Sequence, residues 1–102
     1  MARLIWAEHA LAQLEDILGF IAQDNPTAAK KLGREVWHEV NRLPVFPRSG
    51  ARPAELTGTI YRRVSIRPIL VYYRVEKEDV IITYVRRGES RFSLDQLEEN
   101  ED

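Results

Sequence analysis

The sequence predicts an α+β protein in which a helical hairpin packs on a twisted, mainly antiparallel sheet. Three observations support this prediction. In the first half of the chain, apolar residues recur three and four positions apart, as in amphipathic helices. Over residues 60–86 the spacing becomes two, with many β-branched and aromatic residues, which is typical of strands. Residues 44–59 contain three prolines and two glycines, and we expect them to connect the two halves as a loop.

The predicted order of elements is β-α-α-β-β-β, beginning with a short strand at residues 3–7. A helix then begins at Glu8. Its apolar side consists of Leu11, Leu14, Ile17, Leu18 and Ile21. Asn25 is a good N-cap for a second helix, and Pro26 fits the first helical position, where its missing N–H has no cost. The second helix is expected to run to Leu43, and the short break between the helices predicts an antiparallel hairpin.

Three strands are predicted at residues 60–65, 69–75 and 80–86. The short segments between them favour antiparallel pairing of consecutive strands. Most positions of the second and third strands are apolar on both faces. These two strands are therefore expected in the middle of the sheet.

The chain of 102 residues is expected to form a single domain, residues 1–102, with an acidic tail from about residue 93 to 102. It contains no cysteine, which excludes disulfides, thiolate metal sites and a cysteine nucleophile. His9 and His38 lie far apart, so we expect no metal site and no cofactor. No signal peptide or membrane-spanning segment is recognisable, and the expected location is the cytoplasm, without membrane contact.

The net charge of −1 conceals an uneven distribution along the chain. Residues 44–91 carry ten basic and five acidic groups, whereas residues 92–102 carry five acidic groups and no basic one. A basic face attracts nucleic acid or an acidic protein surface. The alternative is an ordinary solvated surface of mixed charge.

Arginines recur on the predicted strands and in the loops beside them. The set is Arg52, Arg62, Arg63, Arg67, Arg74, Arg86, Arg87 and Arg91. An antiparallel meander brings the end of its third strand close to the first two, so several guanidinium groups are expected to form one cluster. Guanidinium groups bind phosphate and carboxylate in a bidentate manner. The structural alternative is that each arginine covers apolar surface with its stem and that the four tyrosines belong to the core.

Three stretches carry a resemblance to a known family: "EHALAQLEDILGFIAQDNPTAAKKL", "LPVFPRSGARPAEL" and "YRRVSIRPILVYYRVEKEDVIITYVRRGESR". In this order, over residues 3–91, they resemble the ParE/RelE superfamily of type II toxin–antitoxin toxins, which includes plasmid stabilisation proteins. The resemblance implies a bacterial toxin that a cognate, ParD-like antitoxin holds inactive in a hetero-oligomer. An amphipathic helix and an extended segment of the antitoxin are expected on the helical hairpin and the sheet edge.

The superfamily has two branches. ParE-like members poison DNA gyrase and are not nucleases, whereas RelE-like members cleave mRNA on the ribosome. The long helical hairpin with "DNPTAA" favours the ParE-like branch. Three departures weaken the nuclease alternative: Glu89 stands at or beside a position where many relatives have Arg, Phe92 replaces a tyrosine, and the loop at residues 47–56 lacks lysine. We therefore expect a gyrase-binding protein rather than an enzyme, with a ribosome-dependent endoribonuclease as the alternative.

The resemblance also implies which residues act. The expected target-binding residues are Arg63, Tyr73, Arg86, Arg87 and Arg91. A ribonuclease would instead use Arg62, Arg63, Arg86, Arg87 and Arg91 to orient the scissile phosphate and stabilise developing charge. Which of Arg62 and Arg63 serves the site stays open, because a one-residue change of register exchanges their faces.

Overall fold

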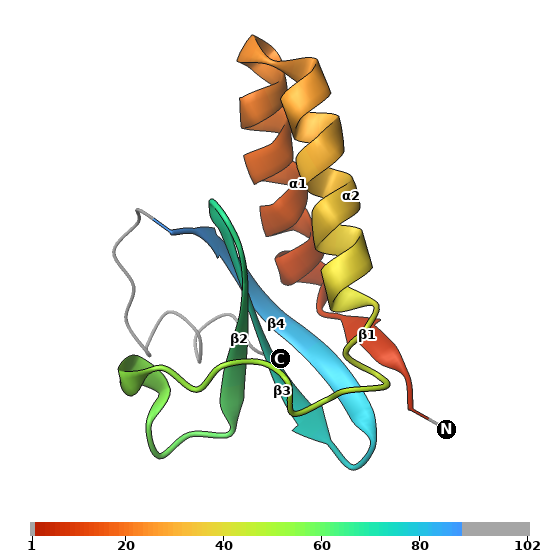
Figure 1. Ribbon diagram of the computed structural model, residues 1–102, viewed down its shortest axis with the longest axis vertical. Helices are drawn as coiled ribbons and strands as arrows, with labels where there is room; N and C mark the ends of the chain where they lie inside the picture. Colours follow the sequence, from red (N-terminus) through yellow and green to blue (C-terminus); the bar gives the residue numbers. More distant parts are fainter. Residues whose placement is uncertain (1, 89–102) are drawn as a thin grey trace.

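A computed structural model of the chain describes residues 2–88, and its elements follow the predicted order. The elements are β1 (Leu4–Trp6), α1 (Glu8–Asp24), α2 (Pro26–Val40), the 3₁₀ helix η1 (Ala54–Leu56), β2 (Tyr61–Ile66), β3 (Ile69–Glu76) and β4 (Asp79–Arg87). Figure 1 shows the two helices as an antiparallel hairpin on one side of the sheet. Among the described residues, no helix is both long enough and apolar enough to cross a membrane.

The start of α2 follows the capping rules closely. The Asn25 side-chain oxygen accepts a hydrogen bond from the Ala28 N–H at 3.0 Å, and Pro26 occupies the first helical position, as predicted. Helix α2 ends at Val40, before the predicted end at Leu43. Pro44 explains the difference, because a proline disfavours the helical conformation of the residue before it. The chain continues in turns instead.

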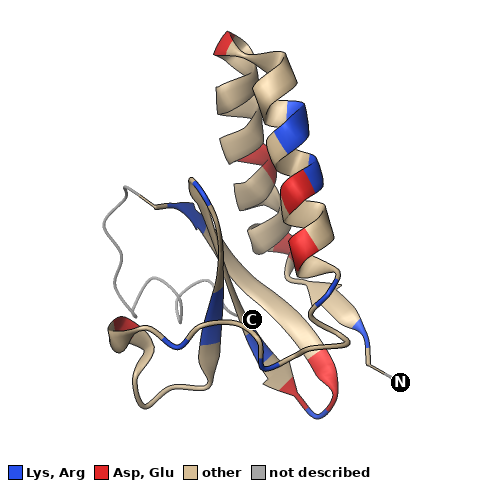
Figure 2. Cartoon of the chain, viewed as in Figure 1, with Lys and Arg blue, Asp and Glu red and all other residues tan. Residues whose placement is uncertain are grey.

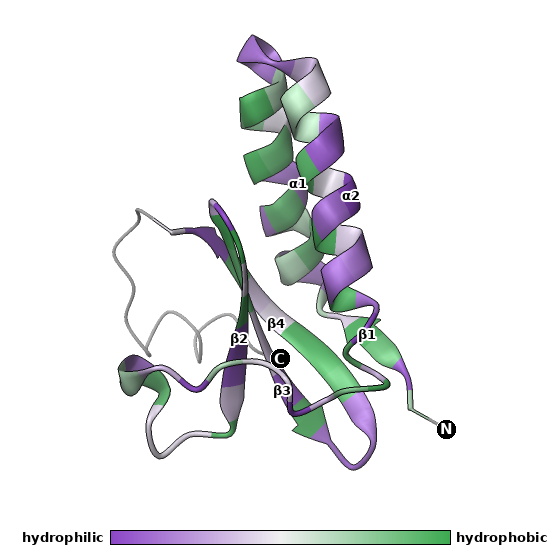
Figure 3. Cartoon of the chain, viewed as in Figure 1, coloured by the Kyte–Doolittle hydropathy of each residue, from purple (hydrophilic) through white to green (hydrophobic). Residues whose placement is uncertain are grey.

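The sheet has the strand order β1-β4-β3-β2. β1 runs parallel to β4, with Leu4 opposite Val80, while the other two pairings are antiparallel. β3 and β4 are the central strands, as their apolar character on both faces predicts. Figure 3 shows that β4 is hydrophobic in its middle and hydrophilic at its ends.

Two side chains of α1 form hydrogen bonds with the backbone of β4 beyond the end of β1. His9 Nε2 donates a hydrogen bond to the Thr83 carbonyl at 2.7 Å, and the Val85 N–H donates to Gln13 Oε1 at 2.9 Å. These bonds satisfy backbone groups that a longer β1 would otherwise pair. They give His9 a structural role and tie the first turns of α1 to the sheet.

A β-bulge interrupts the pairing of β3 with β4. Tyr72 lies opposite Tyr84, but Tyr73 lies opposite Ile82, which leaves Thr83 as the additional residue. Thr83 is fully buried, and its hydroxyl donates to the Tyr72 carbonyl at 3.3 Å. Because of the bulge, Ile82 and Tyr84, which are two positions apart, point to opposite faces of the sheet.

The two faces of the sheet have different compositions. On the face toward α1 and α2, which we call the helix face, the buried residues include Val71, Tyr73, Ile82 and Val85, and they pack against helix residues such as Val36. The opposite face, which we call the arginine face, has a smaller apolar cluster. That cluster consists of Leu56, Tyr61 and Tyr72, with Leu70 and Tyr84 packed against it.

Candidate functional site

Strand register places three arginines on the arginine face: Arg63 of β2, Arg74 of β3 and Arg86 of β4. Figure 2 shows basic segments on β2, at the turn between β2 and β3, and at the end of β4. Arg86 lies directly across from Leu70, which in turn faces Ser65. The end of β4 is therefore brought beside β2 and its turn, although about twenty residues of chain separate them.

A pocket of about 550 Å³ opens on the arginine face beside the β2–β3 turn. Its lining residues are Arg63, Ser65, Arg67, Pro68, Leu70, Arg86 and Gly88. Three guanidinium groups thus converge from β2, the turn and β4, over the apolar side chains of Leu70 and Pro68. We call this the basic pocket. Its charge suits an anionic group of a ligand or partner.

Arg63 is the most strongly engaged arginine of the basic pocket. Its Nη1 lies 2.8 Å from Glu55 Oε1, and the two side chains are 23% and 41% exposed. Its Nε is buried and has no hydrogen-bond partner among the described residues. One side of this guanidinium group is therefore neutralised by Glu55, while Nε keeps a free donor.

Arg86 is oriented by contacts within the sheet. Its Nε donates to the Tyr72 hydroxyl at 3.2 Å, its Nη1 donates to the Arg87 carbonyl at 3.0 Å, and its guanidinium carbon lies 5.8 Å from the centre of the Tyr72 ring. These contacts hold the side chain at the basic pocket.

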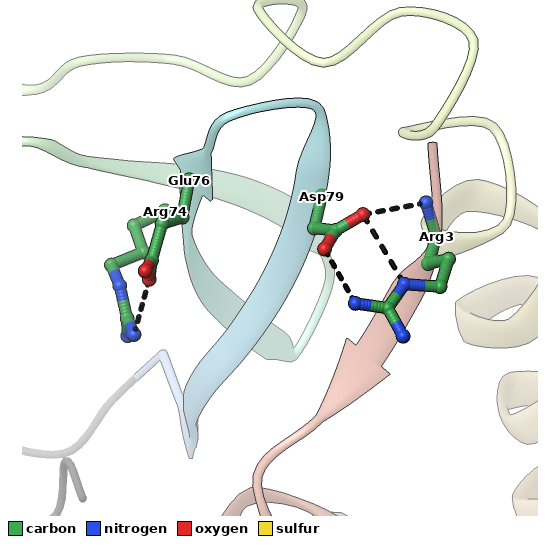
Figure 4. Close-up of polar contacts among 4 residues, drawn as sticks. All are labelled: Arg3, Arg74, Glu76 and Asp79. Carbon is green, nitrogen blue, oxygen red and sulfur yellow. Dashed lines mark hydrogen bonds and ion pairs between the residues drawn. The ribbon is translucent and has the colours of Figure 1, made fainter. Parts of the chain in front are cut away.

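Cations at the other end of the sheet are paired within the chain. Figure 4 shows Arg74 bonded to Glu76 at 3.1 Å, and Arg3 bonded to Asp79 at 2.9 Å. The hydrogen bond from Arg3 lowers the pKa of Asp79, and the hydrogen bond to Asp79 raises the pKa of Arg3. The second pair fastens β1 to the start of β4, next to the backbone bond from Val80 N–H to the Arg3 carbonyl.

Arg62 and Arg87 lie on the helix face, away from the basic pocket. Arg62 Nη1 donates to the carbonyls of Arg48 and Gly50 at 3.2 and 3.0 Å, which ties the loop after α2 to β2. The Arg87 guanidinium lies 6.0 Å from the centre of the Phe20 ring on α1. The register thus places Arg63, and not Arg62, at the basic pocket.

The prediction that Tyr73 contacts a target is wrong. Its side chain is fully buried on the helix face, where the hydroxyl donates to the Pro47 carbonyl at 2.8 Å and accepts from the Gly50 N–H at 2.9 Å. Burial raises its pKa, so the hydroxyl keeps its proton at neutral pH. Tyr73 anchors the loop. Arg91, the remaining predicted residue, lies outside the described residues, as do Glu89 and Phe92.

The basic pocket offers cations but little acid–base chemistry. Within the described part of the chain, its lining contains no histidine, tyrosine or carboxylate. Nearby Tyr84 packs against Tyr72 with ring centres 6.1 Å apart, and burial raises its pKa although Arg86 acts in the opposite direction. Tyr84 therefore stays protonated at neutral pH.

Sequence reasoning missed the contribution of two residues. Arg67 was placed in a loop, but the tight turn at Arg67-Pro68 directs it to the basic pocket. A short, proline-containing turn between two arginine-bearing strands is the available signal. The ion pair of Glu55 with Arg63 joins the connecting loop to β2, and no pattern in the local sequence predicts it.

The two-helix hairpin covers one face of the four-stranded sheet, and the basic pocket lies on the other face. Residues 4–92 match the family described as ParE toxin of type II toxin-antitoxin system, parDE. The chain therefore belongs to the ParE toxin family.

Individual relatives agree with this assignment. The chain is 30% identical over 81 residues to the Y4kP protein of Sinorhizobium fredii, covering 79% of this chain and 83% of that protein. It is 28% identical over 88 residues to toxin RelE2 of Caulobacter vibrioides, covering 86% and 97%. A solved structure of the chromosomal ParDE TA system from P. aeruginosa superposes with a TM-score of 0.72 at 26% identity, covering 87% of this chain and 98% of that one.

Proposed function

We propose that this ParE-family toxin arrests growth by binding DNA gyrase in the cytoplasm through its arginine face, and that a ParD-like antitoxin neutralises it. The observation that carries the proposal is the basic pocket, in which Arg63, Arg67 and Arg86 converge. A cluster of guanidinium groups over an apolar floor fits an acidic patch on a protein surface.

The composition of the pocket favours a binding protein over a nuclease. General acid–base catalysis needs a group that accepts a proton near neutral pH. The described lining offers only cations, the Ser65 hydroxyl and apolar groups, and the pKa of the neighbouring Tyr84 is raised. The similarity to RelE2 keeps RNA cleavage as the competing outcome of the test.

An antitoxin would find two kinds of surface on this chain. The outer edge of β2 is paired only in part: Ala51 and Arg63 exchange backbone bonds of 2.9 Å, whereas exposed Ser65 has no backbone partner on its outward side among residues 2–88. An extended segment fits such an edge. Large exposed apolar side chains suit an amphipathic helix. Among the described residues they are Leu11, Phe20, Trp37, Val45, Phe46 and Ile60.

The decisive experiment exposes two targets separately to the purified toxin. With gyrase, ATP and plasmid DNA, we expect trapped double-strand breaks that disappear when the toxin is first mixed with its antitoxin. With translating ribosomes, we expect intact mRNA. Cuts placed by codon, together with unaffected gyrase, would overturn the proposal and establish the ribonuclease alternative.

A further inference from the structure

Glu55 is an acidic side chain that reaches an arginine of the basic pocket. It comes from η1, in the connection between α2 and β2, and its carboxylate lies 2.8 Å from Arg63 Nη1. The described ion pairs at the other end of the sheet join Arg74 to Glu76 and Arg3 to Asp79, and none of these four residues lines the pocket. Glu55 therefore has a distinct position relative to any bound anion.

Packing fixes the Glu55 carboxylate in this position. The next residue, Leu56, is fully buried against Tyr61 and Tyr72 on the arginine face. Its backbone is bonded on both sides, from Leu56 N–H to the Pro53 carbonyl at 2.9 Å and from Thr59 N–H to the Leu56 carbonyl at 3.0 Å. The short helix is thus anchored, and its carboxylate is presented to Arg63 by the fold.

An anion that approaches Arg63 meets this carboxylate in one of two ways. It binds beside Glu55, at the exposed part of the Arg63 side chain, and experiences repulsion between like charges; or it displaces Glu55 and breaks the existing ion pair. Both routes weaken binding. A nucleic-acid strand suffers most, because it carries a negative charge at every phosphate and cannot turn a neutral part toward Glu55.

We propose that Glu55 is a specificity-determining residue of the basic pocket, whose carboxylate on Arg63 disfavours nucleic-acid phosphates. A protein surface can place one carboxylate near Arg67 and Arg86 and neutral groups near Glu55, which a phosphodiester chain cannot do. The inference rests on the proposed role of the basic pocket in target binding. The inference concerns which ligand the basic pocket selects, and its test does not require gyrase.

The test compares charge-neutral substitutions of two paired glutamates. Binding of a short, fluorescein-labelled single-stranded RNA is followed by anisotropy at low ionic strength for the full-length protein and for the Glu55→Gln and Glu76→Gln variants. Both variants gain the same net charge, but Glu76 pairs with Arg74 outside the pocket. We expect Glu55→Gln to tighten RNA binding about three- to tenfold, and Glu76→Gln to change it less than about twofold.

A second substitution traces the gain to Arg63. In the Glu55→Gln background, Arg63→Gln is expected to abolish the gain, while Arg63→Lys retains part of it. Thermal melting confirms that each variant is folded. Equal tightening by Glu55→Gln and Glu76→Gln, no tightening by either, or a gain that survives Arg63→Gln would overturn the inference. Failure of the gyrase assay, by contrast, leaves this RNA-binding comparison intact and bears on the proposed function alone.

Discussion

Strands β2, β3 and β4 contribute residues to both faces of the sheet, and the two faces differ in burial and charge. On the helix face, Tyr73 and Ile82 are fully buried, and the Tyr73 hydroxyl is bonded within the chain. On the arginine face, Arg63 and Arg86 border a pocket, and the Nε of Arg63 has no partner among residues 2–88. Neighbouring residues of one strand thus have opposite roles. Position in the pleat, and not residue type, separates the arginines of the basic pocket from Arg62 and Arg87.

The largest expected difference between the faces concerns two adjacent isoleucines of β4. Ile82 is fully buried on the helix face, whereas Ile81 is only partly buried on the other face. We expect Ile82→Ala to lower the free energy of unfolding by about 3 kcal/mol, because it leaves a cavity in the main core. Ile81→Ala should cost about 1 kcal/mol. Urea denaturation measures both values, and equal losses would contradict the assignment of the faces.

The anchor of the loop after α2 gives the next effect. Tyr73→Phe removes the hydroxyl that bonds the Pro47 carbonyl and the Gly50 N–H, so we expect a loss of about 1–3 kcal/mol in the free energy of unfolding. A Cβ at Gly50 would lie 2.4 Å from that hydroxyl, so Gly50→Ala disturbs the same contact.

Because both substitutions act on one contact, their effects should not add in the double variant. Amide hydrogen exchange at Gly50 provides a direct measurement, since its N–H is protected only while the Tyr73 hydroxyl accepts it. Fully additive losses, or unchanged exchange in Tyr73→Phe, would show that this bond does not hold the loop.

A comparison of Arg62 with Arg63 separates stability from activity. Arg62→Gln loses two bonds to loop carbonyls, and we expect it to cost about 1 kcal/mol of stability while growth arrest on induction persists. Arg63→Gln should alter stability by less than about 1 kcal/mol, because its ion pair with Glu55 is partly exposed. It should abolish growth arrest. If the two phenotypes were exchanged, the basic pocket would not be the target-binding site.

The smallest effect is the pH dependence of the Arg3–Asp79 pair, which lies on neither face but at the sheet's far end. The pKa of Asp79 is lowered in the folded protein by the hydrogen bond from Arg3. The pair therefore contributes its stability above the pKa of an unfolded Asp, about 4, and loses it as the pH falls further through the lowered pKa. Asp79→Asn should make the acid limb of the stability profile shallower. Exchange of the Val80 amide, bonded to the Arg3 carbonyl, reports this locally.

Most of the fold was predictable because its signals are local. Helical spacing, the Asn25 cap and the change to strand spacing each depend on a few neighbouring residues, and the structure confirms the elements they predict. The candidate site was predictable only in part. Arg63 and Arg86 do lie together, but the buried position of Tyr73 and the helix-face position of Arg62 depend on which face the helices cover. Arg91 stays outside the described residues.

By itself, the sequence determined the order of the elements, the helical hairpin, the two central strands and the presence of many arginines near strand ends. Tertiary structure alone decided which arginines meet. In strict alternation from Ile82, Arg86 would point to the helix face and Arg87 away from it. The bulge at Thr83 reverses both, because one additional residue shifts every later side chain of β4 to the other face. That shift depends on the pairing of β4 with β3. The local sequence of β4 does not predict it.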